Sequence, residues 1–302
     1  GGNMEVVVDG LVKNVKGDYE ISKTAGLAYA INNLMVDNQG AANDATFYIY
    51  PGTYNLSEYE IKQINVTSGT LKVYKSIPVV TRSTNDEVII IGLEKALISE
   101  VADGATVLFS GITIQDFEGT GAALVAENKG KVVLSDCEII NEDGTPDEDT
   151  PLVEGNDPEN VEDDDSDSYL VYTAEQLAAA FADKEVESIG LGADIAVENT
   201  LVFPADRKAT LDLRGWNLTI ADPDKVANTY AINNLGDLTI KDSYGIGAVT
   251  ARGIYNGYDA EGNHSANAKI TIVSGTFNAM GTNGGAAVFN YGVADINGGK
   301  FV

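Results

Sequence analysis

The sequence has few of the residues from which many protein sites are built. Its 302 residues include one cysteine (Cys137), one histidine (His264) and one tryptophan (Trp216). A single cysteine excludes an intrachain disulfide framework, and a single histidine argues against a transition-metal site built on histidines. Cys137 lies in an apolar run far in sequence from the histidine, so we expect a small buried side chain and no nucleophile. His264 lies in a polar stretch and is expected in an exposed loop.

Positive charge is also scarce. Only four arginines occur, and the formal net charge is −27. Nucleic acids and anionic membranes need clustered Lys or Arg, so neither is an expected partner. No run approaches the roughly 18 apolar residues of a transmembrane helix, so we expect no membrane insertion. We predict no cofactor and no metal site, although an acidic surface attracts cations and calcium could associate loosely with it.

Turn-forming residues are abundant, although proline numbers only seven. The chain has 32 glycines, and glycine with Asn, Asp and β-branched runs indicates short strands joined by tight turns. Helical periodicity interrupts this pattern at residues 22–34 and residues 173–181. A strand and a turn follow each helix, and further β-runs come after them. The sequence therefore predicts two tandem modules, each of which opens on a short capping helix.

Both predicted helices have the features of end caps. Thr173 and Gln176 form a capping box at the start of the second helix. In each helix the apolar residues share one face: Leu27, Ile31 and Leu34 in the first, and Leu177, Ala180 and Phe181 in the second. Such a helix covers the strand edges and the apolar core at the end of a stack of strands.

The domain boundaries follow from these helices and from charge. We place the first module at residues 1–141 and the second at residues 169–302. Between them, residues 142–168 carry 13 acidic side chains and no Lys or Arg, which predicts an extended, flexible linker. The chain opens on Gly1-Gly2 without methionine, from which we expect a processed product. It closes without a second helix, from which we expect a fragment of a longer stack or an end covered by a partner.

Irregular internal repeats support stacked strands within both modules. Residues 107–114 align with residues 132–139 at an offset of 25. In the second module we take four apolar positions as equivalent: Leu213, Ile240, Ile272 and Ile296. Their offsets of 27, 32 and 24 are typical of stacked turns of chain with loops of variable length. Asparagines are expected to stack at the turns, and the candidates are Asn128, Asn234 and Asn290.

The segments 210–220, 270–277 and 295–301, with Tyr50-Pro-Gly-Thr-Tyr54 in the first module, resemble right-handed parallel β-helix proteins of the pectin-lyase-like class. Their Ser-Gly-Thr-Phe and Gly-Gly-Lys-Phe endings look like repeats of large adhesin-like surface proteins of gut bacteria. The resemblance implies an all-β fold of two tandem right-handed parallel β-helix (solenoid) modules. It also implies an extracellular or bacterial cell-surface location. This fold hosts polysaccharide lyases, glycoside hydrolases, adhesins and phage spikes, so it does not select a function.

No catalytic constellation stands out. A lyase of this fold needs a basic residue beside carboxylates, for which Arg82 and Arg207 are the candidates. A hydrolase needs two carboxylates across a cleft, but paired aspartates occur only at residues 163–165, inside the predicted linker. The single candidates are Asp212, Asp237, Asp242 and Asp295. Aspartates at such positions usually form turns, so we assign no catalytic residue.

Aromatic residues give the better functional prediction, because the chain has 14 tyrosines. Exposed tyrosines on a flat sheet could stack on sugar rings, and we select Tyr48, Tyr50, Tyr54, Tyr255 and Tyr258 as candidate glycan-binding residues. Tyr48 and Tyr50 fall on one strand face by alternation. The alternative is that these tyrosines pack at the edge of the core.

We therefore expect a non-enzymatic, extracellular, adhesin-like or structural protein that presents a surface to a polysaccharide or to a surface protein. One alternative is a bacteriophage fibre, spike or virion-decoration protein, which would be located on the virion and could be a homotrimer. Another is a polysaccharide lyase or glycoside hydrolase of the pectin-lyase-like fold. The adhesin-like function needs no catalytic group, whereas a lyase or hydrolase would require a cluster of carboxylates or basic residues in one groove.

Overall fold

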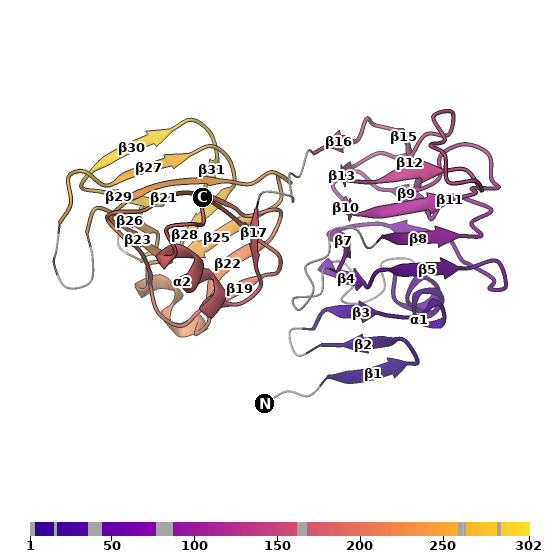
Figure 1. Ribbon diagram of the computed structural model, residues 1–302, viewed down its shortest axis with the longest axis horizontal. Helices are drawn as coiled ribbons and strands as arrows, with labels where there is room; N and C mark the ends of the chain where they lie inside the picture. Colours follow the sequence, from indigo (N-terminus) through magenta and orange to yellow (C-terminus); the bar gives the residue numbers. More distant parts are fainter. Residues whose placement is uncertain are drawn as a thin grey trace. The chain divides into compact units, whose positions relative to one another are not determined.

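A computed structural model describes residues 4–14, 17–35, 44–76, 87–161, 168–258, 262, 264–282 and 285–302. The chain divides into two compact units, residues 1–162 and residues 163–302 (Figure 1). Each unit consists mainly of parallel β-sheets. The all-β class and the presence of two units agree with the sequence analysis.

Unit 1 contains three sheets. The first has the spatial order β1 (Glu5–Val8), β2 (Leu11–Lys13), β3 (Tyr19–Ile21), β4 (Thr46–Ile49), β7 (Thr70–Lys75), β10 (Thr106–Ser110), β13 (Lys131–Ser135) and β16 (Glu159–Asn160). The second is β5 (Gly52–Asn55), β8 (Val88–Ile91), β11 (Ile112–Gln115) and β14 (Glu138–Ile140). The third is β6 (Ile64–Val66), β9 (Ile98–Val101), β12 (Val125–Asn128) and β15 (Val153–Gly155). From β4 onward, the chain therefore visits the three sheets in turn.

Unit 2 repeats this arrangement. Its first sheet is β17 (Tyr169–Val171), β18 (Ser188–Leu191), β21 (Lys208–Asp212), β24 (Asp237–Lys241), β27 (Lys269–Ile272) and β30 (Val293–Ile296). The second is β19 (Ile195–Val197), β22 (Asn217–Ile220), β25 (Ala248–Ala251), β28 (Thr276–Ala279) and β31 (Lys300–Phe301). The third is β20 (Leu201–Phe203), β23 (Ile232–Asn234), β26 (Ile254–Asn256) and β29 (Val288–Asn290). All strand pairs of these three sheets are parallel.

A helix packs near the start of the strands in each unit. In unit 1, α1 (Thr24–Tyr29) continues into a π-helical turn, η1 (Ala30–Met35), and packs against β1, β2 and β5. In unit 2, α2 (Ala174–Ala182) packs against β17, β19 and β20. The Thr173 hydroxyl accepts a hydrogen bond from the Gln176 backbone N–H at 3.2 Å, which confirms the predicted cap. A 3₁₀ helix, η4 (Pro223–Asn228), lies between β22 and β23.

The predicted register is confirmed in unit 1 and off by two residues at one position in unit 2. Phe109 pairs with Leu134, as the offset of 25 requires. In unit 2, however, Ile240 pairs with Leu211 and not with Leu213. Leu213 lies beyond the end of β21, where the chain turns through Arg214 at a φ of 50°. A shift of two keeps the same sheet face inward, so both leucines are buried.

The predicted linker boundary also differs from the structure. Within residues 142–168, β15 and β16 pair in parallel with β12 and β13 of unit 1. Asp143 and Asp147 make local turns by accepting hydrogen bonds from Thr145 and Thr150. The acidic composition predicts a linker here because the side chains of these two short strands are solvated. Their backbones nevertheless complete the sheets. The acidic run at residues 163–165 lies outside the described residues.

Inward side chains form an apolar core in each unit, and asparagines line one corner of unit 2. The largest buried side chains include Phe47 and Phe109 in unit 1 and Trp216 and Phe203 in unit 2. The Asn234 amide donates to the side chain of Asn256 at 2.8 Å, and Asn256 donates to that of Asn290 at 2.7 Å. The predicted stacking of Asn234 and Asn290 is thus completed by Asn256. Asn128 belongs to unit 1 and donates to the carbonyl of Asn156.

Candidate functional site

The predicted site tyrosines of unit 1 do not form a common exposed platform. Tyr54 is 2% exposed and pairs with Ile90, on the inward face of its sheet. Its hydroxyl donates to the carbonyl of Tyr50 at 2.7 Å, and burial raises the pKa of Tyr54 to about 12. The prediction of Tyr54 as a sugar-stacking residue is therefore wrong. The alternation that carries Tyr48 outward on β4 does not extend through the turn to β5.

Tyr48 and Tyr50 are half-buried and engaged with neighbours. The Tyr48 ring stacks on Tyr74 at 6.2 Å between centroids. The Tyr50 hydroxyl donates to the Glu20 carboxylate at 2.7 Å, and burial together with this carboxylate raises the pKa of Tyr50 to about 12. These contacts favour a packing role at the edge of the sheet over a free binding surface.

Tyr255 and Tyr258, by contrast, belong to a continuous group of rings in unit 2. We define the aromatic strip as six residues: Tyr230, Tyr255, Tyr258, His264, Phe289 and Tyr291. Strand register builds its centre, because Tyr255 on β26 pairs with Phe289 on β29. A backbone bridge between Tyr258 and His264 brings the only histidine of the chain to the same group.

Each ring of the aromatic strip contacts the next. The Tyr230 and Tyr255 centroids lie 3.7 Å apart, and those of Tyr255 and Phe289 lie 5.5 Å apart. Tyr258 lies 5.3 Å from Tyr255 and 5.3 Å from Tyr291, and His264 lies 4.5 Å from Tyr258. Apart from the closer Tyr230–Tyr255 pair, these separations match tilted and edge-to-face packing of aromatic pairs, which holds the rings in fixed orientations.

Exposure grades along the aromatic strip. Tyr230 is buried at one end, Tyr255, Tyr258 and Phe289 are half-buried, and Tyr291 at the other end is 53% exposed. His264 is exposed, as predicted. The strip therefore offers ring faces and edges to solvent from a base that is packed into the sheet. A rigid aromatic surface with polar hydroxyl and imidazole groups is suited to stacking on a ligand ring.

An unsatisfied polar group lies beside the strip. Asn233 pairs with Tyr255 across β23 and β26 and is 3% exposed. Its side-chain oxygen is buried and accepts no hydrogen bond from the described residues. Buried acceptors nearly always have a partner, so this oxygen marks a place where a further donor would be stabilised.

The two arginines and two aspartates of unit 2 that are buried have structural roles. Arg207, a candidate base, donates to the carbonyls of Phe181 at 2.7 Å and Ala180 at 3.1 Å, at the end of α2. Arg214 donates to the Leu191 carbonyl at 2.9 Å. Both guanidinium groups are thus bonded to backbone. Arg82, the other candidate base, lies outside the described residues.

Two of the four candidate acids, Asp212 and Asp242, form turns. Asp212 accepts from the backbone N–H groups of Arg214 and Ser243, each at 2.9 Å. Asp242 accepts from Gly215 at 2.8 Å and Gly247 at 2.7 Å. Burial raises the pKa of Asp242, against the lowering effect of these backbone donors. Asp237 and Asp295 lie on β24 and β30, and the Asp295 carboxylate pairs with Lys269 at 3.8 Å.

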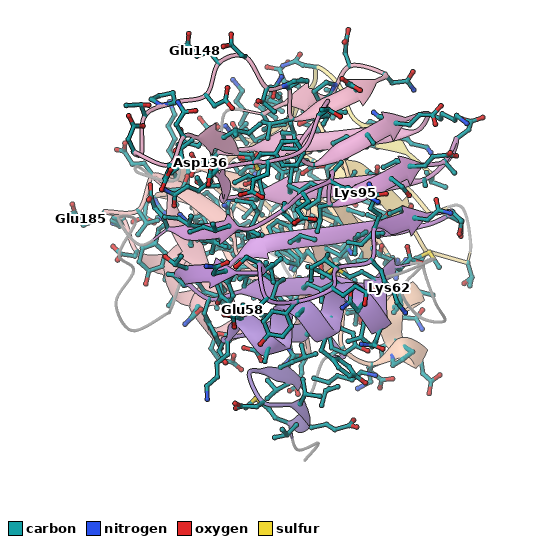
Figure 2. The ribbon with its side chains drawn as sticks, turned by 90° about the vertical axis from the view of Figure 1, so that its right-hand side faces the viewer. Glu58, Lys62, Lys95, Asp136, Glu148 and Glu185 are labelled. Atoms are coloured by element: carbon teal, nitrogen blue, oxygen red, sulfur yellow. The ribbon has the colours of Figure 1, made fainter. Side chains whose placement is uncertain are left out.

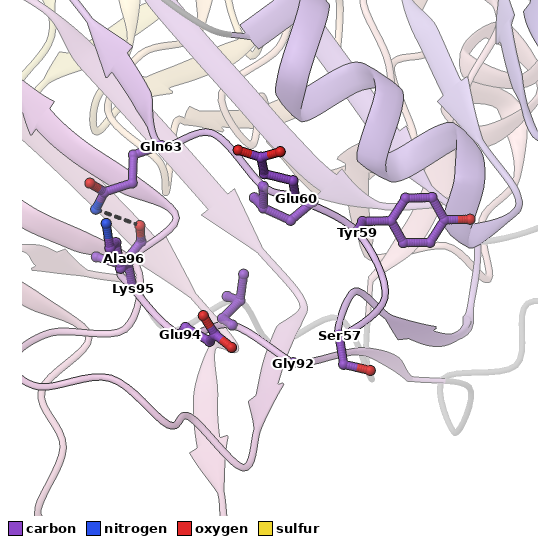
Figure 3. Close-up of a pocket in the computed structure, with 10 residues that line it drawn as sticks. Ser57, Tyr59, Glu60, Gln63, Gly92, Glu94, Lys95 and Ala96 are labelled. Atoms are coloured by element: carbon purple, nitrogen blue, oxygen red, sulfur yellow. Dashed lines mark hydrogen bonds between the residues drawn. The ribbon is translucent and has the colours of Figure 1, made fainter.

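Unit 1 carries a polar depression of its own, with a volume of about 270 Å³ (Figure 3). Two segments line it, residues 57–63 after β5 and residues 92–96 after β8. Gln63 donates to the carbonyl of Ala96 at 3.0 Å across the depression. The carboxylates of Glu60 and Glu94 are exposed beside the depression, and each comes from a different one of these two segments. Exposed charges such as these are solvated, as they are elsewhere on the surface (Figure 2).

Cys137 packs against the core of unit 1 but is half-buried, whereas the sequence predicts a buried side chain. Its sulfur lies 3.4 Å from the carbonyl oxygen of Ser135 and 3.5 Å from that of Phe109. Burial raises the pKa of the Cys137 thiol to about 12. At neutral pH this thiol is protonated, and a protonated thiol is a poor nucleophile.

Sequence reasoning identifies only two of the six strip residues, Tyr255 and Tyr258. It does not identify Tyr230, Phe289 and Tyr291, because each is ordinary in its local context, and it predicts His264 only as an exposed loop residue. One repeated signal could have located the centre of the strip: Tyr255-Asn256 and Phe289-Asn290 share an aromatic-asparagine order. The asparagine points inward to the ladder, so the preceding ring of each pair points outward from the same sheet.

Within the described ranges, no group of three or more His, Cys, Asp or Glu side chains is placed to hold a metal ion. No helix in those ranges is long and apolar enough to cross a membrane. No protein-family model matches the chain, and no match was found among curated proteins or among solved structures.

Proposed function

We propose that this chain is a non-enzymatic, extracellular, adhesin-like protein whose unit 2 binds a glycan on the aromatic strip. We further propose that each unit is a right-handed parallel β-helix. The visit of the chain to three parallel sheets in turn supports this architecture. A stack of parallel strands offers a long, flat and repetitive surface, which suits a linear ligand.

The aromatic strip is the observation that carries the proposed function. Neighbouring strands lie about 4.8 Å apart, so residues in register repeat at a distance comparable with the length of a sugar ring. Tyr255 and Phe289 follow this repeat on β26 and β29. Tyrosine presents a large and rigid amphipathic surface at little cost in conformational entropy. An aromatic group that extends from core to solvent marks a binding surface.

The engagement of the candidate acids and bases supports a binding role over catalysis. A hydrolase needs a carboxylic acid and a carboxylate across a cleft. Asp212 and Asp242 instead hold backbone N–H groups in turns, and Arg207 holds the end of α2. These groups cannot reach a ligand without breaking the local structure.

Affinity electrophoresis through gels that contain neutral or acidic polysaccharides tests the proposal. Wild-type protein should be retarded by at least one polysaccharide and should release no oligosaccharide from it. Tyr291→Ala should weaken the retardation about tenfold, because it removes the most exposed tyrosine of the strip at little cost to packing.

Tyr169→Ala is the matched control, since Tyr169 is 39% exposed on β17 of the same unit but lies outside the strip. Its retardation should equal that of wild type. Equal loss in both variants, or retardation that Tyr291→Ala leaves unchanged, would contradict a site on the strip. New oligosaccharides in the chromatogram would contradict the non-enzymatic role.

A further inference from the structure

A small pocket of about 170 Å³ adjoins the aromatic strip. Phe289 belongs to both, and the other described lining residues are Ala227 and Asn228 at the end of η4, Arg252, Gly281, Thr282 and Gly285. Two glycines of this wall, Gly281 and Gly285, lie so close that a Cβ on either would come within 3.1 Å of the other backbone. A side chain at either position would therefore crowd this wall of the pocket.

Of the described residues that line this pocket, Arg252 alone is charged. Its guanidinium carbon lies 5.0 Å from the centroid of the Tyr230 ring, so the arginine continues the stack of Tyr230 on Tyr255. Stacking on an aromatic face fixes the plane of the guanidinium group and reduces the entropy that binding would cost. Its backbone N–H donates to the carbonyl of Thr229, which anchors the residue after β25.

The side chain of Arg252 differs from those of the other described arginines. Arg207 and Arg214 are buried and donate to backbone carbonyls. Arg252 is half-buried, and among the described residues no carboxylate lies within ion-pair distance of it. In a chain of net charge −27, a guanidinium group at a pocket that has no carboxylate partner among the described residues retains its capacity for an external anion.

We propose that this pocket binds the anionic substituent of a glycan, a carboxylate or a sulfate ester, while the sugar ring that carries it stacks on the aromatic strip. The inference rests on the proposed function of the strip. A guanidinium group offers planar paired N–H donors that match the oxygens of either anion. Phe289, which lines the pocket and packs edge-on to Tyr230 at 5.3 Å, links the anion position to the stacking position.

The charge of the whole chain narrows the ligand class further. A net charge of −27 repels a dense polyanion along its whole length. A single anion on an otherwise neutral glycan is repelled little by acidic side chains more than about 10 Å away at 0.1 M salt, because salt screens them. Its direct attraction to Arg252 is screened much less. The ligand is thus a largely neutral glycan with isolated anionic residues.

The test is a glycan array of matched sets, in which each neutral oligosaccharide is printed beside its mono-carboxylated, mono-sulfated and fully charged forms. Wild-type protein should bind a mono-anionic member at least about tenfold better than its neutral counterpart, as expected for a charge-assisted hydrogen bond. It should bind the fully charged form less well than the mono-anionic form. The carboxylated and sulfated members identify which anion the pocket takes.

Two variants separate the pocket from the strip. Arg252→Gln should abolish the preference for the mono-anionic member over its neutral counterpart, whereas Tyr291→Ala should weaken binding of both and keep the preference. Lys241→Gln removes the same charge from an exposed position on β24 and should behave as wild type. Equal binding of neutral and mono-anionic members, or an unchanged preference in Arg252→Gln, would overturn this inference while the glycan-binding function stands. Absence of binding to every set would overturn both.

Discussion

Arg207 provides a sharp test, because the sequence offers it as a catalytic base and the structure makes it a helix cap. Its guanidinium group donates to the carbonyls of Phe181 and Ala180 at the end of α2, and to that of Val186 just beyond. The side chain is 3% exposed and lies 5.3 Å over the Phe203 ring. A cation at a helix C-terminus also interacts favourably with the helix dipole.

The change Arg207→Met keeps an unbranched apolar stem and removes all of these hydrogen bonds. Each hydrogen bond from a charged group contributes about 1.5–3 kcal/mol, and loss of the donor leaves buried carbonyls without partners. Removal of the buried charge offsets part of this loss. We expect the free energy of unfolding of unit 2 to fall by about 3 kcal/mol.

Urea unfolding followed by tryptophan fluorescence measures this value directly. Trp216 is the single tryptophan of the chain, lies in unit 2 and is 1% exposed, so its emission reports on that unit alone. Lys208→Met is the control, since Lys208 is the exposed neighbour of Arg207 and should change stability by less than about 0.5 kcal/mol. An Arg207→Met protein as stable as wild type would refute the assignment of Arg207 as a cap.

Three further outcomes are expected. Asn256→Ala removes the middle of the asparagine ladder and should destabilise unit 2 by about 3 kcal/mol in the same urea assay. Asn290→Ala removes only its exposed end and should cost less than about 1 kcal/mol, and equal losses would contradict a ladder. Cys137 should resist maleimide at pH 8 in the folded protein and react in urea, because its folded pKa is about 12; fast native labelling would contradict this raised pKa. Tyr54 has a folded pKa of about 12 against an ordinary value of 10.0, so its contribution to unit 1 is complete below pH 10 and lost as the pH rises through 12. The alkaline loss of ellipticity should be smaller in Tyr54→Phe, and an unchanged profile would contradict this reasoning.

The parts of the fold that sequence predicted are those with local or periodic signals. The cap at Thr173 needs only residues 173 and 176, and the pairing of Phe109 with Leu134 follows from a repeat without insertions. The register in unit 2 was misplaced by two residues because Leu211 and Leu213 are both apolar and both buried. Only the turn at Arg214, which depends on Asp212 and Asp242, distinguishes them.

The candidate site was harder to predict, because it depends on which residues neighbouring strands bring together. Tyr255 and Tyr258 were selected from a tyrosine-rich loop, and the structure adds Tyr230, Phe289 and Tyr291 from other segments. The prediction fails for Tyr54, because the sequence predicts a turn after β4 but not the direction in which the side chains of β5 point beyond it. Side-chain direction at such corners is set by the backbone turn and not by alternation.

The central claim is that a glycan lies on the aromatic strip of unit 2. Hydroxyl-radical footprinting, with and without a polysaccharide that retards the protein, tests this location directly. We predict that the ligand protects Tyr255, Tyr258 and Tyr291 from oxidation and leaves Tyr59, an exposed tyrosine of unit 1, unchanged. Protection at Tyr59 with none on the strip would place the ligand in unit 1 and contradict the claim.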